Sequence, residues 1–406
     1  MKSIARLKNP VMAYDWGSRT LLADFLGRKA PLDPDAAEGP KPEAELWMGA
    51  HPKAPSRVET NGEWAPLDRV IEKNPADCLG PETAAKRSGR LPFLFKILAV
   101  EKPLSIQVHP TKSQAREGFE KESGQGVPLD ARDRNYRDKS AKTEIIHAIS
   151  PFRLMAGFRP VEDIVKNFQP CRSKALEGAL SGLEKRPDPG GLGHFYRSLM
   201  TLGAGARAGV IQKAAAAAAD SPQNETSRWV LRLHKLYPGD MGVLGPLLFN
   251  LIRLEPGQAL VIDAGTPHSY LEGLGAELMN NSDNVVRGGL TSKHMDIPGL
   301  LKILDWKTGP PLPAAPEKIG KHERVFRANR QDFSLSVLTC AEKPLAARRR
   351  GPEVLLCVEG AAKIISGGAP PLVLKKGRSA FVPARAPGYA VSGPCRIYKA
   401  GLAGPV

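Results

Sequence analysis

The sequence predicts a mainly β protein, in which an α-helical domain is inserted between strand-rich segments and two β-units are related to each other. The first observation is the 40 glycines and 37 prolines among 406 residues. Since they follow no repeating triplet, they indicate many turns and favour short strands over a helical bundle. The second observation is a change to helix-forming sequence between residues 156 and 239. The third is a diverged internal repeat, which suggests two related barrels or sandwiches.

Short apolar runs separated by turn residues fill the first 155 residues. Residues 91–100 and 104–109 are predicted strands, because they are rich in apolar residues and are followed by Glu-Lys-Pro and Pro-Thr-Lys. Strand-like sequence resumes near Gly245. We therefore assign residues 1–155 and 240–310 to one discontinuous β-domain.

The inserted segment, residues 156–239, has a helical pattern. It contains the alanine run 214–219, and Trp229, Leu233, Leu236 and Tyr237 recur at helical spacing. Pro238-Gly239 is a stop signal for that helix.

A proline-rich linker at residues 309–316 precedes a C-terminal module, residues 317–406. Residues 256–268 can be laid over residues 376–388 at a constant offset, and each copy reads as turn, strand and turn. His268 in the first copy corresponds to Gly388 in the second. We therefore expect the second copy to lack metal ligands and to be structural.

Composition excludes several classes of protein. The net charge of +16 is spread along the chain, and the one tight basic run, Arg348 to Arg350, is interpreted as a solvated loop. No apolar stretch reaches the roughly 20 residues of a membrane span, and residues 1–15 hold no secretory signal. We expect a soluble, cytoplasmic, monomeric protein that binds neither nucleic acid nor membrane.

The five cysteines are scattered and never form a C-x-x-C pair. Neither a disulfide framework nor a cysteine zinc site is predicted.

Four side chains suggest a metal site. Gln107 and His109 are two apart on a predicted strand and so leave one face, although a solvent-facing polar stripe would look the same. Glu144 opens another predicted strand, and His268 follows a strand at a turn. Two imidazoles, a carboxylate and an amide suit a divalent first-row ion, which leaves zinc, manganese and iron open. His147 would compete, but its odd spacing from Glu144 puts it on the other strand face.

Arg287 follows the apolar pair Val285-Val286 and precedes two glycines. Because glycine allows a close approach, this arginine could meet an anionic ligand; a surface arginine in a turn is the alternative.

Several blocks, in order, resemble the type I mannose-6-phosphate isomerase family. They are Tyr14-Asp-Trp-Gly-Ser18, Glu45-Leu-Trp-Met-Gly-Ala-His51, Leu91-Pro-Phe-Leu-Phe-Lys-Ile-Leu98, Leu104-Ser-Ile-Gln-Val-His-Pro110, Asn135-Tyr-Arg-Asp138 through Glu144, Pro267-His-Ser-Tyr270 and Ser282-Asp-Asn-Val-Val-Arg287 with Leu290-Thr-Ser-Lys293. The resemblance covers residues 1–305 well and the C-terminal module more loosely. It implies two cupin-like jelly-roll barrels with a helical domain and one zinc ion.

The resemblance also implies roles for individual residues. The zinc ligands would be Gln107, His109, Glu144 and His268, and Arg287 would be the active-site arginine. Six further residues match positions that line the family's substrate pocket: Lys96, Ser105, Lys142, Glu277, Asp283 and Lys293. One departure is Ala141, where the family has a histidine.

The activity implied is the interconversion of mannose 6-phosphate and fructose 6-phosphate through a cis-enediolate. We expect Lys96, as a desolvated lysine, to carry the proton, with Glu277 as the second choice. The phosphate is expected at Lys142 or another cation, with Ser105 as a hydroxyl donor. A non-catalytic sugar- or metal-binding cupin and an iron-dependent oxygenase remain as alternatives.

Overall fold

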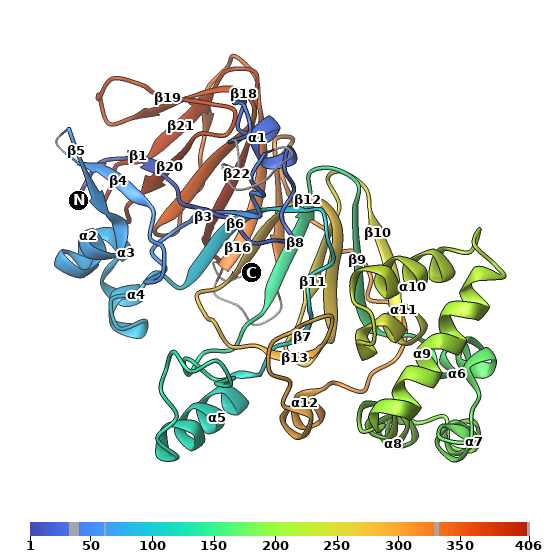
Figure 1. Cartoon of the computed structure of the whole chain (residues 1–406). Coiled ribbons are helices and arrows are strands. Elements are labelled where there is room, and N and C mark those ends of the chain that lie inside the picture. The colour runs from blue at the N-terminus through green and yellow to red at the C-terminus, as the bar shows by residue number, and fades with distance from the viewer. Residues whose placement is uncertain (32–39, 61, 329–332, 404–406) are drawn as a thin grey trace.

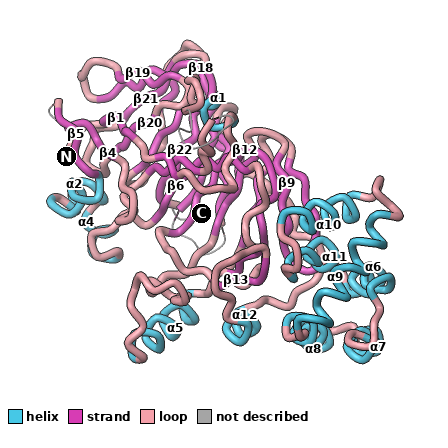
Figure 2. Tube along the Cα trace, in the orientation of Figure 1, coloured by secondary structure: helices cyan, strands magenta, loops and turns pink. Residues whose placement is uncertain are grey.

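The computed structural model describes residues 1–31, 40–60, 62–328 and 333–403, which form two large β-sheets and a helical domain (Figures 1 and 2). The first sheet has ten strands and contains most of the predicted metal ligands. Its strands are β2 (Val11–Met12), β3 (Glu45–Met48), β6 (Phe93–Val100), β7 (Ile106–Val108), β8 (Glu144–Ala148), β9 (Phe152–Phe158), β10 (Phe249–Leu254), β11 (Ala259–Ile262), β12 (His268–Asn280) and β13 (Val286–Gly289).

The second sheet has twelve strands, and its pairing is also antiparallel. Its strands are β1 (Ala5–Lys8), β4 (Arg57–Thr60), β5 (Glu63–Pro66), β14 (Glu317–Ile319), β15 (Glu323–Arg327), β16 (Phe333–Cys340), β17 (Leu345–Ala346), β18 (Glu353–Ser366), β19 (Leu372–Lys375), β20 (Ser379–Val382), β21 (Tyr389–Ser392) and β22 (Cys395–Leu402). The mainly β class with two β-units is therefore confirmed.

The helical domain lies at the β9–β10 side of the first sheet, in the lower right of Figure 1. Its helices are α6 (Val161–Phe168), η1 (Gln169–Cys171), α7 (Glu177–Lys185), α8 (Pro189–Met200), α9 (Ala204–Ala219), α10 (Glu225–Leu236), η2 (Met241–Leu244) and α11 (Gly245–Leu248). The other helices are α1 (Leu21–Phe25), α2 (Leu67–Lys73), α3 (Pro75–Leu79), α4 (Pro81–Lys86), α5 (Lys112–Gly124) and α12 (Ile297–Ile303).

Helix α10 follows the sequence pattern closely. Trp229 and Leu233 are buried, and the helix ends at Leu236, immediately before the predicted Pro238-Gly239 stop. Leu236, the third residue of that pattern, is 37% exposed.

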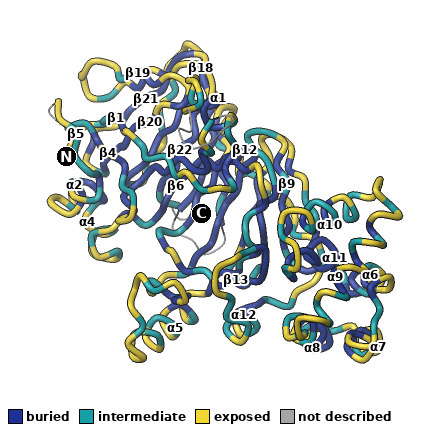
Figure 3. Tube along the Cα trace, viewed as in Figure 1, coloured by how far each residue is buried: buried dark blue, intermediate teal, exposed yellow. Residues whose placement is uncertain are grey.

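Strand β6 is buried on both of its faces, which explains its continuous apolar run. Phe95 and Ile97 belong to a core that also contains second-sheet residues such as Leu335 and Phe381, so the two sheets pack against each other. The residues between them face the interior of the first sheet. Lys96 is one of these, and its direction follows from the two-residue period of a strand. Figure 3 shows that the buried stretches are concentrated in the sheets, and the exposed ones in the outer loops and helices.

The sheet pairings divide the N-terminal region between the two sheets. Residues 1–155 were assigned to the first β-domain, but β1 pairs with β20 of the C-terminal module and with β4. Local sequence patterns could not predict that β1 joins the second sheet, because the pairing of strands that are far apart in the chain depends on tertiary packing. The domain boundaries otherwise stay a prediction.

All five cysteines are buried and unpaired, as their spacing predicted. Within the described ranges, helices long and apolar enough to cross a bilayer are absent.

Candidate metal centre and active site

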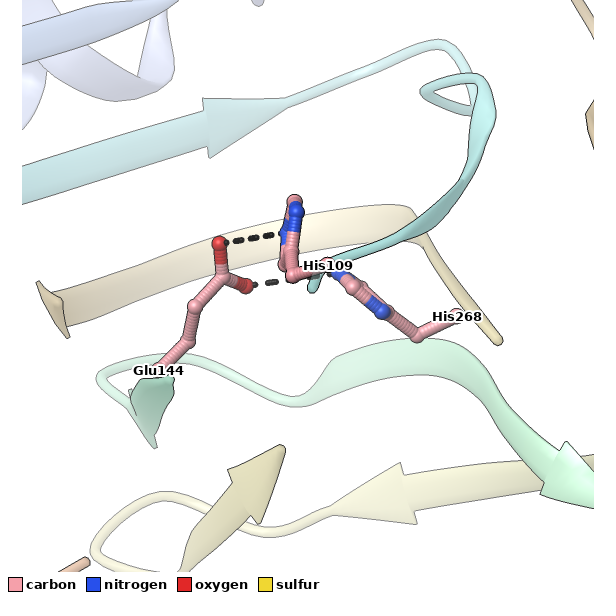
Figure 4. A group of neighbouring side chains, drawn as sticks. All are labelled: His109, Glu144 and His268. Atoms are coloured by element: carbon pink, nitrogen blue, oxygen red, sulfur yellow. Dashed lines mark ion pairs between the residues drawn. The ribbon is translucent and has the colours of Figure 1, made fainter. Parts of the chain in front are cut away.

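Three predicted ligands meet inside the first sheet (Figure 4). His109 directly follows β7, Glu144 begins β8 and His268 begins β12. Their ligand atoms all lie within 4.8 Å of one another. Glu144 pairs with Ile262, just before the turn that leads into β12, and also with Met279 near the far end of β12. The sheet must curl to bring both strand segments to Glu144, and this curling brings the three ligands together.

The two imidazole rings approach one carboxylate. His109 Nε2 lies 3.0 Å from Glu144 Oε1, and His268 Nε2 lies 3.4 Å from Glu144 Oε2. All three residues are buried.

Backbone carbonyls fix the orientation of both rings. His109 Nδ1 is 3.0 Å from the carbonyl oxygen of Asn284, and His268 Nδ1 is 3.0 Å from that of Thr266. Since a carbonyl only accepts, each Nδ1 carries the hydrogen, and each Nε2 of a neutral ring presents a lone pair. His109 Nε2 is buried and lacks a hydrogen bond. Burial, followed by the nearby Lys142 ammonium, lowers the pKa of His109 to about 3, so the ring is neutral.

Two lone pairs facing a carboxylate repel one another unless a cation lies between them. The donor set therefore fits a divalent metal ion, and the buried, unpartnered Nε2 of His109 is the specific sign of it.

Glu144 is held by two further groups. Tyr270 Oη donates to its Oε2 at 2.8 Å, and Lys142 Nζ lies 3.0 Å from its Oε1. Burial alone would raise the pKa of Glu144, but the nearby Lys142 ammonium holds it well below its usual range. A permanently ionised carboxylate is what a metal ligand requires.

Gln107 reaches the same site through strand register. It pairs with His268 on one side and with Arg287 on the other. Residues directly opposite each other in a sheet put their side chains on the same face. Gln107 and His268 both line the pocket, whereas Arg287 lies opposite Gln107 on β13 and is outside the lining residues.

The same pocket holds a buried cluster of three charged side chains. Lys96 Nζ lies 3.0 Å from Glu277 Oε2 and 3.6 Å from Glu45 Oε2. Burial opposes the charge of Lys96, but Glu277 and Glu45 outweigh it and raise the pKa of the amine. This is opposite to the downward shift expected from desolvation alone. Burial, reinforced by Glu144, raises the pKa of Glu277.

Positive side chains gather beside Arg287. Burial lowers the pKa of its guanidinium, and Arg137 lowers it further. Burial also lowers the pKa of Lys293, as do Arg287, Lys53 and Arg137. Neighbouring cations that disfavour each other's charge are the arrangement expected around a site for an anion.

Asp283 lies at the edge of this cationic group. Its Oδ2 is 3.4 Å from His51 Nε2. Burial alone would raise its pKa, but His51 and Lys142 lower it to about 2. Ser105 directly precedes β7, two positions before Gln107.

The two glycines after Arg287 serve the fold, and this changes their interpretation. A Cβ at Gly289 would lie 2.7 Å from the Cα of Gly242, and one at Gly288 would lie 3.3 Å from Leu300. The close approach that they permit is to other parts of the chain.

Sequence reasoning missed three residues that support the site. Glu45 pairs with Lys96, Tyr270 donates to Glu144, and Asn284 supplies the carbonyl that orients His109. All three belong to the sequence blocks that resemble the family, and this resemblance was the signal that could have identified them. Their contacts could not be predicted, because their partners are distant in sequence. His147, the rejected ligand, faces the other way, and its Nδ1 lies 3.0 Å from Tyr398 Oη of the second sheet.

Comparisons with known proteins agree with this geometry. Residues 4–161 match the family description "Phosphomannose isomerase type I, catalytic domain", and residues 322–400 match "Mannose-6-phosphate isomerase, cupin domain". A mannose-6-phosphate isomerase of Escherichia coli (strain K12) is 39% identical, over 97% of this chain and 98% of its own length. One from Rattus norvegicus is 34% identical over 74% of this chain and 72% of its own length.

A solved structure has a closely similar fold. The mannose 6-phosphate isomerase from Salmonella typhimurium, bound to its substrate fructose 6-phosphate and to zinc, superposes with a TM-score of 0.89 and 38% identity. The match covers 98% of this chain and 99% of that one. This chain therefore belongs to the type I mannose-6-phosphate isomerase family.

Proposed function

We propose that this chain is a zinc-dependent aldose–ketose isomerase that interconverts D-mannose 6-phosphate and D-fructose 6-phosphate. The observation that carries the proposal is the pair of imidazole lone pairs aimed at Glu144, in the same pocket as the buried Lys96–Glu277 pair. The relatives named for this reaction, and the similar structure that holds zinc and fructose 6-phosphate, support the choice of substrate.

Gln107, His109, Glu144 and His268 would hold the metal ion. Amide, imidazole and carboxylate donors suit zinc with a position left open for substrate. When bound, zinc supplies a Lewis acid that polarises the sugar carbonyl and offsets negative charge on its oxygens.

Glu277 is our choice for the residue that moves the proton between C1 and C2. Its raised pKa brings it closer to neutral pH, where a general base that must also return the proton works best. Lys96, whose pKa is raised, stays charged. It therefore holds Glu277 in place and adds positive charge next to the developing enediolate, instead of taking the proton itself.

Arg287 would stabilise the enediolate oxygens, because it stands opposite the ligand Gln107. We assign the substrate phosphate to the cations around Lys293, since Lys142 is already paired with Glu144. Ser105 and Asp283 would contact sugar hydroxyls at the edge of this region.

Metal removal tests the proposal. Treatment with EDTA or phenanthroline should abolish isomerisation of mannose 6-phosphate in a coupled assay, and added zinc should restore it. Elemental analysis should find one zinc per chain in wild type and almost none in His109→Ala. His147→Ala, a buried histidine on the opposite strand face, is the matched control and should keep its zinc. Turnover that survives complete metal removal would refute the metal's role.

The same preparation separates the alternatives. A non-catalytic cupin would retain metal without isomerase activity, and an iron-dependent oxygenase would consume oxygen when loaded with iron. Either result would replace the isomerase assignment.

A further inference from the structure

The second sheet contains a polar pocket at the position that corresponds to the active site in the first sheet. Glu144 begins β8 and pairs with Ile262; Glu353 begins β18 and pairs with Val382. Ile262 and Val382 are separated by the offset of the internal repeat. Glu353 thus holds the place of the metal-ligating carboxylate.

The partner of that carboxylate is retained as well. Tyr389 Oη donates to Glu353 Oε2 at 2.6 Å, just as Tyr270 Oη donates to Glu144. In both sheets the tyrosine lies near the start of the strand that follows the repeated unit.

A lysine replaces the acidic residue on the neighbouring strand. Glu277 lies two positions before the β12 residue that pairs with Glu144, and Lys399 lies two positions before the β22 residue that pairs with Glu353. Lys399 Nζ lies 3.0 Å from Glu323 Oε1 and 3.8 Å from Glu353 Oε1. A fixed ammonium therefore stands between two carboxylates in this pocket.

The position of Glu323 completes the correspondence. Glu45 on β3 pairs with Leu98 of β6, and Glu323 on β15 pairs with Leu338 of β16. In each sheet this glutamate then contacts the buried lysine of its own pocket.

The basic run Arg348 to Arg350 lies at the mouth of this pocket. Arg348 and Arg350 line it, together with Ser334 and Ser336 from β16. The Arg348 carbonyl accepts a hydrogen bond from Lys399 Nζ at 2.8 Å, which anchors the run to the buried cluster. Arg349 instead donates to the carbonyl of Pro383. The run is thus an exposed loop, as predicted, and it also lines this pocket.

The chemistry changes from the floor of the pocket to its mouth. Carboxyl, ammonium and hydroxyl groups at the floor match sugar hydroxyls, whereas two carboxyl groups there disfavour an anion. Exposed guanidinium groups at the mouth suit a phosphate, which arginine binds in a bidentate manner.

We propose that the second sheet carries an additional, metal-independent binding site for a phosphorylated sugar, with Glu323, Glu353 and Lys399 facing the hydroxyls and Arg348 and Arg350 facing the phosphate. Buried ion clusters contribute little net stability compared with apolar packing. A retained cluster under two arginines at an open pocket therefore fits ligand binding better than a purely structural role.

Counting binding sites tests the proposal on the zinc-loaded, full-length protein. Isothermal titration with fructose 6-phosphate should give two sites per chain. The double variant Arg348→Ser, Arg350→Ser should weaken one of them by roughly tenfold to a hundredfold, the effect of losing charge-assisted hydrogen bonds. Its isomerase turnover should stay at the wild-type value. Arg378→Ser is the matched control and should keep both sites, because Arg378 is an exposed arginine just before β20 and lies outside the pocket.

Either of two results would overturn the proposal: one site in the wild-type protein, or two unweakened sites in the double variant. Fructose and inorganic phosphate test the ligand class separately. If either one alone occupied the second site as tightly as fructose 6-phosphate, the site would not be one for a phosphorylated sugar.

Discussion

Tyr270→Phe removes a single hydroxyl group from the candidate metal centre. Tyr270 is 3% exposed, and its Oη donates to Glu144 Oε2 at 2.8 Å. The substitution keeps the ring, so the packing against Phe152 stays in place. What changes is one charge-assisted hydrogen bond to a buried carboxylate, a bond that contributes about 1.5–3 kcal/mol.

Two consequences should be measurable. The metal-free variant should lose about 2 kcal/mol of unfolding free energy in a urea titration, because a buried carboxylate oxygen is left without its donor. Its zinc affinity should fall by roughly tenfold to a hundredfold in a competitive chelator titration, the usual effect of removing a group that orients a metal ligand.

Tyr389→Phe is the matched control, since Tyr389 donates to Glu353 at 2.6 Å and is also buried. It should lose comparable stability and no zinc affinity. The reasoning is refuted if Tyr270→Phe binds zinc as tightly as wild type, or if both variants weaken zinc binding equally.

Three further predictions follow from individual residues. Arg287→Ala should lower kcat far more than it raises KM, because its interactions are made mainly in the transition state; a change confined to KM would assign it to substrate binding. Burial raises the pKa of Glu353 from 4.5 to about 7. This folded-state pKa lies above the unfolded value, so the folded protein holds the proton between these pH values and becomes less stable as pH rises through them. The total loss is roughly 3 kcal/mol, and urea titrations from pH 4 to 8 should show it in wild type and not in Glu353→Gln; equal slopes would contradict this. Asn284→Ala should release the 137–140 loop, to which its side chain is hydrogen-bonded, and weaken zinc binding through His109. Unchanged hydrogen exchange in that loop would argue against it.

Much of the fold could be predicted from local patterns. Strand β6 was visible as an apolar run, helix α10 as a periodic stripe with a stop signal, and Glu144 as the residue that opens a strand. These signals depend on residues that are close in sequence.

The metal ligands were first suggested by residue type and strand spacing, and their combination came from the family resemblance. Gln107 and His109 share a face because a strand has a period of two residues, which any reader of the sequence can apply. The direction of the Lys96 pKa shift could not be obtained in this way. It depends on Glu45 and Glu277, which approach the amine from two neighbouring strands.

The sequence by itself determined the alternation of strands and helices, the repeat, and the identities of the groups able to bind a metal ion and a phosphate. These depend on side-chain chemistry and on spacing along a single strand or helix. Only the tertiary structure decided that β1 joins the C-terminal sheet, that Lys96 lies between two carboxylates, and that the Arg348–Arg350 run lies at the mouth of a pocket. Those outcomes depend on the register between distant strands and on the electrostatic interactions of charged groups that are far apart in the sequence. Local sequence patterns contain no information about either.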